Sequence, residues 1–427
     1  MDKFRLAGLL TIVTIGVCAL PRALSATSTD PLAAFVLLGQ TDAGAQFALA
    51  RVIIDKAGAE CPSLKPAAGD GDQWPMTPRD NADKDNFDVT VCEALYPMDG
   101  SRMDLDGTSI RLPPVPATVS RVVVFGDTGC KPKEQEDCKR AKDWPFREMA
   151  DAAAKADPSP DLILHMGDYN YRGTPGSISI EQANGETQRV RVYDAGDNTP
   201  SVTCTLAGPY HGQNSVGSDS PDSWKAWNDD FFTPAAKLLR TAPWVFARGN
   251  HELCSRAGPG YFYLLDPGSA LVHGSGGQQI CPPAENSMPL IFHQPYRVDL
   301  GGLSVVVLDS ANACDQGSLH QSHFDAQFKQ IQPLIRDAPA ANAVWLVSHR
   351  PLWGLEKPRT HTPKTQLDAS GHNAIIDKTL QTAFARSPLP KPVHLVLSGH
   401  MHRFQTISFD PPSTQPDQLI LGNSGVA

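Results

Sequence analysis

The sequence predicts a layered α/β protein that is preceded by a small β-rich region. From Arg121 onward, apolar runs alternate with stretches of helical periodicity, which is the pattern of sheets covered by helices. Before that point, short β-like runs are separated by clusters of Gly, Pro, Asp and Asn, as in all-β regions. Between the two lies the proline-rich stretch RLPPVPATVS, which is typical of a stiff linker.

The first 25 residues have the pattern of a secretory signal peptide. Lys3 and Arg5 precede the apolar stretch Leu6–Leu20, and small residues follow it. This stretch is too short to favour a membrane span. Cys18 raises a lipid anchor as an alternative, but Val17 before it is not the small residue that such a site needs. We therefore expect a secreted or periplasmic protein without a stable membrane span.

The cysteine count also indicates export. Nine cysteines are present, and eight remain when Cys18 is set aside. An even number in an exported chain predicts disulfides, and Cys130–Cys138 and Cys61–Cys92 would each close a loop within one region. Four further cysteines allow three connectivities, between which the sequence does not choose: Cys204, Cys254, Cys281 and Cys314.

The charge excludes one class of partner. The net charge is −9 and the isoelectric point is near 5.8, so a general nucleic-acid binder is not expected, because the cationic footprint is missing.

The chain divides into three parts: residues 1–25 as the signal peptide, 26–117 as a small all-β domain and 118–427 as a layered α/β domain. The β-like runs of the N-terminal domain are Ala34–Gly39, Gln46–Ile54, Phe87–Ala94 and Ser109–Leu112. The runs of the second part are apolar on both faces, as in buried sheets: Val122–Phe125, Leu162–Met166, Trp244–Ala247, Leu303–Leu308, Val344–Val347 and Val393–Leu397.

Helices are expected between these strands. One is predicted over 144–156 and another over 223–240, with Ser223 as its N-cap. Two more are indicated by apolar residues that share a helical face, namely Phe324, Phe328, Ile331 and Ile335, and then Ile376, Leu380 and Phe384. The segment 172–222 is a long polar insertion, as in a loop at the rim of a site.

Five of the six core strand candidates lead into residues that bind metals. These segments are Gly126-Asp127-Thr128-Gly129, Gly167-Asp168 with Tyr171, Gly249-Asn250-His251-Glu252, Ser348-His349, and Gly399-His400-Met401-His402. In α/β folds, ligands gather beyond the carboxyl ends of strands, so these residues are expected to meet.

Taken singly, each motif is more often structural. Asp309 ends the sixth strand without a ligand-type neighbour and is assigned a structural role, and Tyr169 is assigned to packing. Together the motifs supply two Asp, one Asn, one Tyr and three His, too many donors for one tetrahedral zinc. The set favours two metal ions that share a carboxylate.

In this order, GDTG, GDYNY, GNHE, LVSH and GHMH resemble the five-block signature of the calcineurin-like metallophosphoesterases. Tyr171 makes the chain similar to the purple acid phosphatase branch. The likeness covers roughly residues 120–427 and departs from the family at Leu346, where valine is usual. It implies a layered β-sandwich core flanked by helices.

The resemblance also implies a ligand set. Asp127, Asp168, Tyr171 and His402 would hold Fe(III), the metal of that branch. A divalent Fe, Zn or Mn would be held by Asp168, Asn250, His349 and His400, with Asp168 as the bridge.

Other residues near these motifs are candidates for contact with the substrate. His251 would face the substrate, and Arg248 and Arg172 are candidates for binding phosphate, with surface arginines as the alternative. The family also has histidines that touch substrate upstream of its last block, for which His361 and His372 are candidates.

The expected activity is hydrolysis of small phosphate monoesters by a metal-activated hydroxide, with His251 protonating the leaving group. A phosphodiesterase with the same metals is the nearest alternative, and a non-catalytic binding module is a further one. The sequence names no protein partner. The chain ends at Ala427 just after a strand-like run, so a longer natural chain is also an alternative.

Overall fold

The computed structural model describes most of the chain outside its first 30 residues. The described residues are 31–68, 71–131, 137–172, 222–254, 256–274, 276–281, 291–313, 321–355 and 377–425, with the backbone of 177–181 and 187–191. The predicted signal peptide, most of the polar segment 172–222, and His361 and His372 lie outside these residues.

One sheet has seven strands in the order β5-β6-β2-β1-β12-β9-β8. Its strands are β1 (Ala33–Gln40), β2 (Gln46–Ile54), β5 (Thr77–Pro78), β6 (Thr90–Tyr96), β8 (Val122–Phe125), β9 (Leu162–His165) and β12 (Trp244–Phe246). The pairs β1–β12, β12–β9 and β9–β8 are parallel. The carboxyl ends of β8, β9 and β12 therefore lie at one edge.

The second sheet has six strands in the order β13-β14-β15-β16-β18-β17. Its strands are β13 (Tyr296–Leu300), β14 (Leu303–Leu308), β15 (Ala343–Ser348), β16 (Val393–Ser398), β17 (Phe404–Ile407) and β18 (Asp417–Leu421). The central pairs β14–β15, β15–β16 and β16–β18 are parallel, as expected of strands that are buried on both faces.

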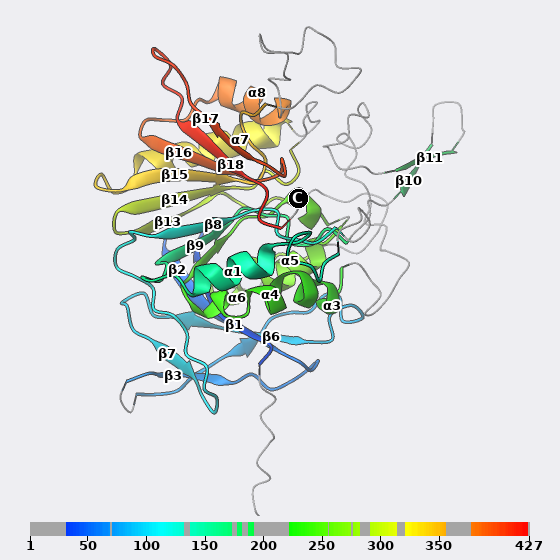
Figure 1. The fold of residues 1–427 in the computed structure, drawn as a ribbon, viewed down its shortest axis with the longest axis vertical. Helices are drawn as coiled ribbons and strands as arrows, with labels where there is room; N and C mark the ends of the chain where they lie inside the picture. Colours follow the sequence, from blue (N-terminus) through cyan, green and yellow to red (C-terminus); the bar gives the residue numbers. More distant parts are fainter. Residues whose placement is uncertain are drawn as a thin grey trace, which may run out of the picture.

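The two sheets pack face to face, with helices on both outer sides (Figure 1). One apolar cluster joins Leu162, Leu164 and Val245 of the first sheet to Val305 and Leu397 of the second. The fold class predicted from the sequence, a β-sandwich core flanked by helices, is confirmed.

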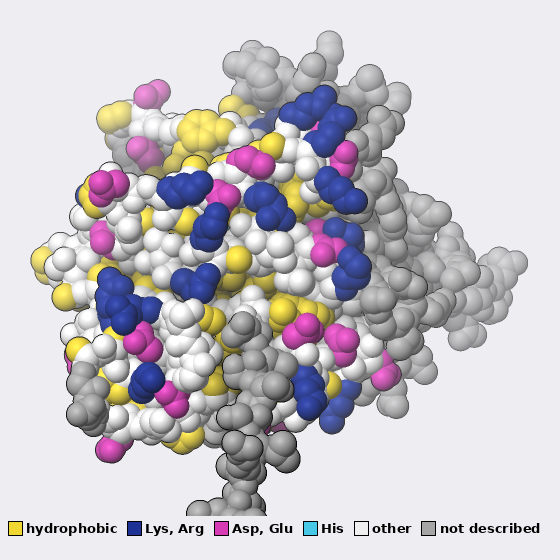
Figure 2. Space-filling view, turned by 60° about the horizontal axis from the view of Figure 1, so that its bottom comes forward, with side chains coloured by type: hydrophobic (Ala, Val, Ile, Leu, Met, Phe, Trp, Pro, Cys, Tyr) yellow, Lys and Arg dark blue, Asp and Glu magenta, His cyan; other side chains and the backbone are white. Residues whose placement is uncertain are grey.

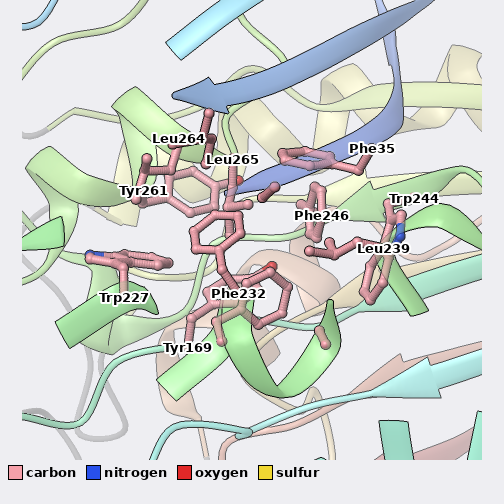
Figure 3. Packing of buried hydrophobic residues seen from close by; sticks show 14 of the residues in the cluster. Phe35, Tyr169, Trp227, Phe232, Leu239, Trp244, Phe246, Tyr261, Leu264 and Leu265 are labelled. Atoms are coloured by element: carbon pink, nitrogen blue, oxygen red, sulfur yellow. The ribbon is translucent and has the colours of Figure 1, made fainter. Parts of the chain in front are cut away.

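The outer face of each sheet has its own apolar cluster. Over the seven-stranded sheet, aromatic side chains such as Phe35, Phe232 and Phe246 pack with Tyr169 and Trp227 (Figure 3). Over the six-stranded sheet, Phe324, Phe328, Ile331 and Ile335 of α7 (Gln321–Arg336) are fully buried, so the predicted helical face is confirmed. The helix α8 (Lys378–Arg386) buries Leu380 beside it, and Asp377 caps this helix.

The predicted helix over 223–240 is not continuous. Ser223 caps it as expected, because its hydroxyl accepts from the N–H of Ala226. The segment then runs through α3 (Trp224–Trp227), a π-helical turn (Asn228–Phe232), α4 (Thr233–Ala235) and a 3₁₀ turn (Leu238–Arg240). Pro234 lacks a backbone donor, and the widened turn buries Asp230, Phe231 and Phe232. Nearby, α1 (Phe146–Ala154) is shorter than the predicted 144–156.

The N-terminal region is rich in strands, as predicted. A three-stranded sheet forms from β3 (Ser63–Pro66), β4 (Trp74–Pro75) and β7 (Met103–Leu105), while β1, β2, β5 and β6 extend the seven-stranded sheet. The expected strand over 109–112 was wrong, since only Arg111 forms an isolated bridge there, with Asp104. The domain boundary at residues 117 and 118 stays a prediction.

Several short elements were not predicted from the sequence. They are β13, β17, the helices α5 (Gly258–Leu264) and α6 (Ala270–His273), and a hairpin of β10 (Ser177–Glu181) with β11 (Thr187–Arg191). The strand-like run near the end of the chain lies within β18. None of the described helices is long and apolar enough to cross a membrane.

Three disulfides are present among the described cysteines. Cys61–Cys92 and Cys130–Cys138 are confirmed, and Cys254–Cys281 settles one pair that the sequence left open. Cys204 and Cys314 lie outside the described residues.

On the face shown in Figure 2, Lys and Arg form separate small groups, with Asp and Glu between them.

Candidate metal centre

The five strand-end motifs meet at one edge of the sandwich. β8, β9 and β12 bring Asp127, Asp168 and Asn250 from one sheet, and β15 and β16 bring His349 and His400 from the other. Contacts between the sheets fix this meeting point, because Asp127 Oδ2 accepts from the backbone N–H of His400 at 2.8 Å. The expectation that distant residues gather beyond the strand ends is therefore met.

The backbone at these ends is in the left-handed region. Among the described residues other than glycine, only Asp127, Asp168, His400 and His402 have positive φ, at 58°, 62°, 72° and 48°. Such a conformation costs about 1–3 kcal/mol per residue and persists where the surroundings enforce it, often at functional sites. All four are predicted ligands.

Glycines allow the backbone to approach these side chains. A Cβ on Gly249 would lie 2.2 Å from Asp168 Oδ1, and a Cβ on Gly399 would lie 2.4 Å from Asp127 Oδ2. Either contact is far below van der Waals distance. The space around both carboxylates therefore depends on glycine at these positions.

One donor group surrounds the Tyr171 hydroxyl. Its oxygen lies 2.8 Å from Asp127 Oδ1, 3.0 Å from Asp168 Oδ2 and 2.8 Å from His402 Nε2. Asp127, Asp168 and His402 place their ligand atoms within 4.8 Å of one another. The two carboxylates and the phenol are buried, and the His402 side chain is 28% exposed.

A second donor group surrounds Asn250 Oδ1. This oxygen lies 2.7 Å from His349 Nε2 and 2.9 Å from His400 Nδ1, and Asp168 Oδ1 lies 3.3 Å from His349 Nε2. Asp168, His349 and His400 again have ligand atoms within 4.8 Å. Asp168 thus belongs to both groups, and each of its two oxygens faces one of them.

The protons available do not satisfy these atoms. Burial and the charges of Asp127 and Asp168 raise the pKa of the Tyr171 phenol well above its usual value, so it keeps one proton, which cannot serve three acceptors. Burial opposes charge on His349, but Asp168 outweighs burial and raises the pKa of its imidazole to about 9. Both raised pKa values reflect the negative charge of the two buried carboxylates, which is a fit for bound metal cations.

His349 is oriented for this role. Its Nδ1 lies 2.7 Å from the carbonyl oxygen of Met166, which can only accept, so Nδ1 carries the proton and Nε2 faces the cluster.

Glu252 is a residue whose role the sequence did not reveal. Its carboxylate accepts from the backbone N–H groups of Asp168, Tyr169 and Gly249 at 2.9 to 3.0 Å. Burial and the Asp168 charge raise the pKa of Glu252, while the backbone donors favour its ionised form. Its place in the GNHE motif was the available signal. It ties the loop after β9 to the loop after β12.

The two arginines proposed for phosphate are engaged elsewhere. Arg248 is buried and forms an ion pair with Asp309 at 2.7 Å, with further bonds to Asn312 and to the Ile291 carbonyl. Arg172 forms a two-bond ion pair with the buried Asp230. These contacts support structural roles for both arginines and for Asp309, which was assigned one from the sequence.

Two other cations touch the ligand histidines. Lys131 Nζ lies 3.1 Å from His402 Nδ1, and Arg350 Nη1 lies 3.0 Å from His400 Nε2. Arg350 is buried and close to the Asp377 carboxyl, whereas Lys131 is partly exposed. Neither was singled out from the sequence.

The aromatic residues of the GDYNY segment have different roles. The predicted packing role of Tyr169 is confirmed, because its ring is fully buried in the aromatic cluster and its hydroxyl donates to the Ala247 carbonyl. The Tyr171 ring contacts the ring of His251, with 4.0 Å between centroids. His251 is partly exposed, and its backbone N–H donates to Asp168 Oδ1. It therefore stands at the rim, beside both donor groups.

A family model decides the identity. The calcineurin-like phosphoesterase model matches residues 120–404. The chain belongs to the calcineurin-like phosphoesterases. No curated protein matches it.

One solved structure has a similar fold. The chain is similar to the purple acid phosphatase PPD1 from seeds of yellow lupin (Lupinus luteus), with a TM-score of 0.50 and 13% sequence identity. The match covers 93% of this chain and 65% of the lupin chain, so this phosphoesterase spans just under two thirds of its relative's length.

Proposed function

We propose that this calcineurin-like phosphoesterase is an exported phosphatase that hydrolyses small phosphate monoesters with two metal ions. The observation that carries the proposal is the position of Asp168. Its two oxygens face two separate donor groups, which is the arrangement of a carboxylate that bridges two metals.

The proposed ligands follow the two groups. Asp127, Asp168, Tyr171 and His402 hold one ion, and Asp168, Asn250, His349 and His400 hold the other. The Tyr171 phenol, buried among carboxylates, would give up its proton only to a highly charged ion, so we assign Fe(III) to the first position and a divalent Fe, Zn or Mn to the second. This set is also that of the purple acid phosphatase branch that the sequence resembles.

The metal pair supplies Lewis acidity and a hydroxide nucleophile at moderate pH. The chain supplies position and protons. Glu252 holds the Asp168 loop in place, and His349 is held by the Met166 carbonyl. His251, at the rim beside Tyr171, donates a proton to the departing alkoxide when its imidazole is charged.

Export is proposed from the disulfides. Three disulfides among the described residues suit an oxidising compartment, and residues 1–25 would direct the chain there.

The test combines metal analysis with an assay. The purified protein should contain about two metal ions per chain and hydrolyse an aryl phosphate monoester faster than the matching diester. Asp168→Asn and His251→Ala should each lower turnover by orders of magnitude, roughly 100-fold or more, while thermal unfolding changes little. Near-parental turnover in both variants would refute the proposed phosphatase. Faster cleavage of the diester than of the monoester would make the protein a phosphodiesterase.

A further inference from the structure

The rim of the metal centre is formed by partly exposed groups. Asp127, Asp168, Asn250 and His349 are at most 1% exposed, whereas Lys131, His251, His400 and His402 are each partly exposed. A substrate that reaches the two donor groups must therefore pass this rim. Lys131 belongs to this rim. It is part of none of the five motifs and has no role in the proposed reaction.

The backbone that carries Lys131 is fixed from several sides. Cys130, the preceding residue, is fully buried and disulfide-bonded to Cys138. The indole N–H of Trp144 donates to the carbonyl of Thr128 at 2.8 Å. The root of the lysine side chain thus lies at a set place beside the loop after β8, while its four-carbon stem can turn.

The Lys131 ammonium lies beside the donor group that surrounds the Tyr171 hydroxyl. Its Nζ is 3.1 Å from His402 Nδ1 and 5.0 Å from the centroid of the Tyr171 ring. The same ring contacts His251, so Lys131 and the proposed proton donor flank one residue.

The contact with His402 cannot persist when its Nε2 is a metal ligand. An imidazole that gives one nitrogen to a metal carries its proton on the other, and the ammonium has only donors to offer. The ammonium then loses this contact with His402. A phosphoryl group at the donor cluster would bring strong acceptor oxygens and negative charge to this place.

We propose that Lys131 binds a phosphoryl oxygen of the substrate and acts as its positioning cation at the rim. The inference rests on the proposed function, because it requires a phosphate ester at the metal centre. Of the two cations that contact a ligand histidine, Arg350 is buried and Lys131 is partly exposed, so Lys131 is the one at the rim.

The experiment compares three variants of the full chain. Lys131→Gln removes the charge and keeps much of the length, Lys131→Arg keeps the charge, and Lys139→Gln removes an exposed lysine that directly follows Cys138 of the same disulfide. Binding of inorganic phosphate is measured by titration calorimetry and as competitive inhibition of aryl phosphate hydrolysis. Metal content and thermal unfolding are recorded for each protein.

Lys131→Gln should weaken phosphate binding roughly ten-fold to a hundred-fold, as expected for the loss of a hydrogen bond to a charged group. It should raise KM more than it lowers kcat and leave the metal content unchanged. Lys131→Arg should retain most of the affinity, and Lys139→Gln all of it.

Two results would overturn the proposal. One is phosphate affinity in Lys131→Gln equal to that of the parent. The other is loss of metal from this variant, which would make Lys131 a support for the ligands. A parent protein without metal or activity would instead refute the proposed function, so the two failures are distinguishable.

Discussion

The Glu252 carboxylate accepts a hydrogen bond from the backbone N–H of Asp168, with 2.9 Å between Oε2 and the nitrogen. The same carboxylate binds the N–H of Gly249, so one side chain joins the loops that follow β9 and β12. The backbone of Asp168, whose carboxylate faces both donor groups, is thereby held at its positive φ.

Glu252→Gln should destabilise the protein and loosen its metals. The amide places two donors where backbone N–H groups point, which costs about 2–4 kcal/mol when buried donors lose their acceptor. Urea unfolding of the metal-free protein and dialysis against a chelator measure the two effects. Glu148→Gln, at an exposed position of α1, is the matched control. Parental stability and metal retention would show that Glu252 is not an anchor.

Arg248→Met should act on stability rather than on substrate binding. Removing one partner of the buried pair leaves the Asp309 charge without its cation, which typically costs about 3–5 kcal/mol. We expect a lower midpoint in urea unfolding and an unchanged KM for aryl phosphate. Arg336→Met, at an exposed position, should change stability by less than about 0.5 kcal/mol. A raised KM at parental stability would return Arg248 to the substrate site.

Tyr171→Phe should remove the visible charge-transfer absorption expected of a phenolate bound to Fe(III). The substitution removes one oxygen from the group of Asp127, Asp168 and His402 and leaves the packing against His251. Absorption spectra at equal iron content measure the effect, with Tyr169→Phe as the control, since that ring is a packing residue. A band of parental intensity in Tyr171→Phe would exclude this ligand.

His293 should make stability depend on pH. Burial opposes its charge, but the Asp266 carboxylate at 2.9 Å outweighs burial and raises the pKa of His293 to about 9. Since the folded pKa lies above the unfolded value near 6.5, the stabilisation is complete below about pH 6.5 and is lost as pH rises through 9. The loss should be on the order of 2–3 kcal/mol.

Urea unfolding at pH 6 and at pH 9.5 checks this dependence. His293→Gln removes the titrating group, so its stability should change less between the two values than that of the parent. An equal change in both proteins would assign the pH dependence to other groups.

Local patterns were sufficient to locate the strand ends. Runs that are mainly apolar on both faces, such as Val122–Phe125 and Leu303–Leu308, predicted strands with correct bounds, and every residue of the second run is buried. The strand over 109–112 failed for the converse reason. Ser109 and Arg111 are exposed, and the segment pairs with β7 only through the bridge between Arg111 and Asp104.

The sequence by itself determined which residues stand at the strand ends and that glycines flank them. Ligand chemistry is a property of side chains, and a tight turn next to a strand is a local requirement, so both are visible in a linear chain. The order of five short motifs then sufficed to select the candidate ligands, which are Asp127, Asp168, Tyr171, Asn250, His349, His400 and His402.

Only the tertiary structure decided which cationic side chains are buried and which lie at the rim of the donor groups. Arg248 and Lys131 look alike as cations beside motif loops, yet one is buried against Asp309, 61 positions away, and the other lies at the rim beside His402. The disulfide between Cys254 and Cys281 and the anchoring role of Glu252 could not be read from the sequence for the same reason. Such contacts join residues far apart in the chain, and the packing of two sheets, rather than any local pattern, brings them together.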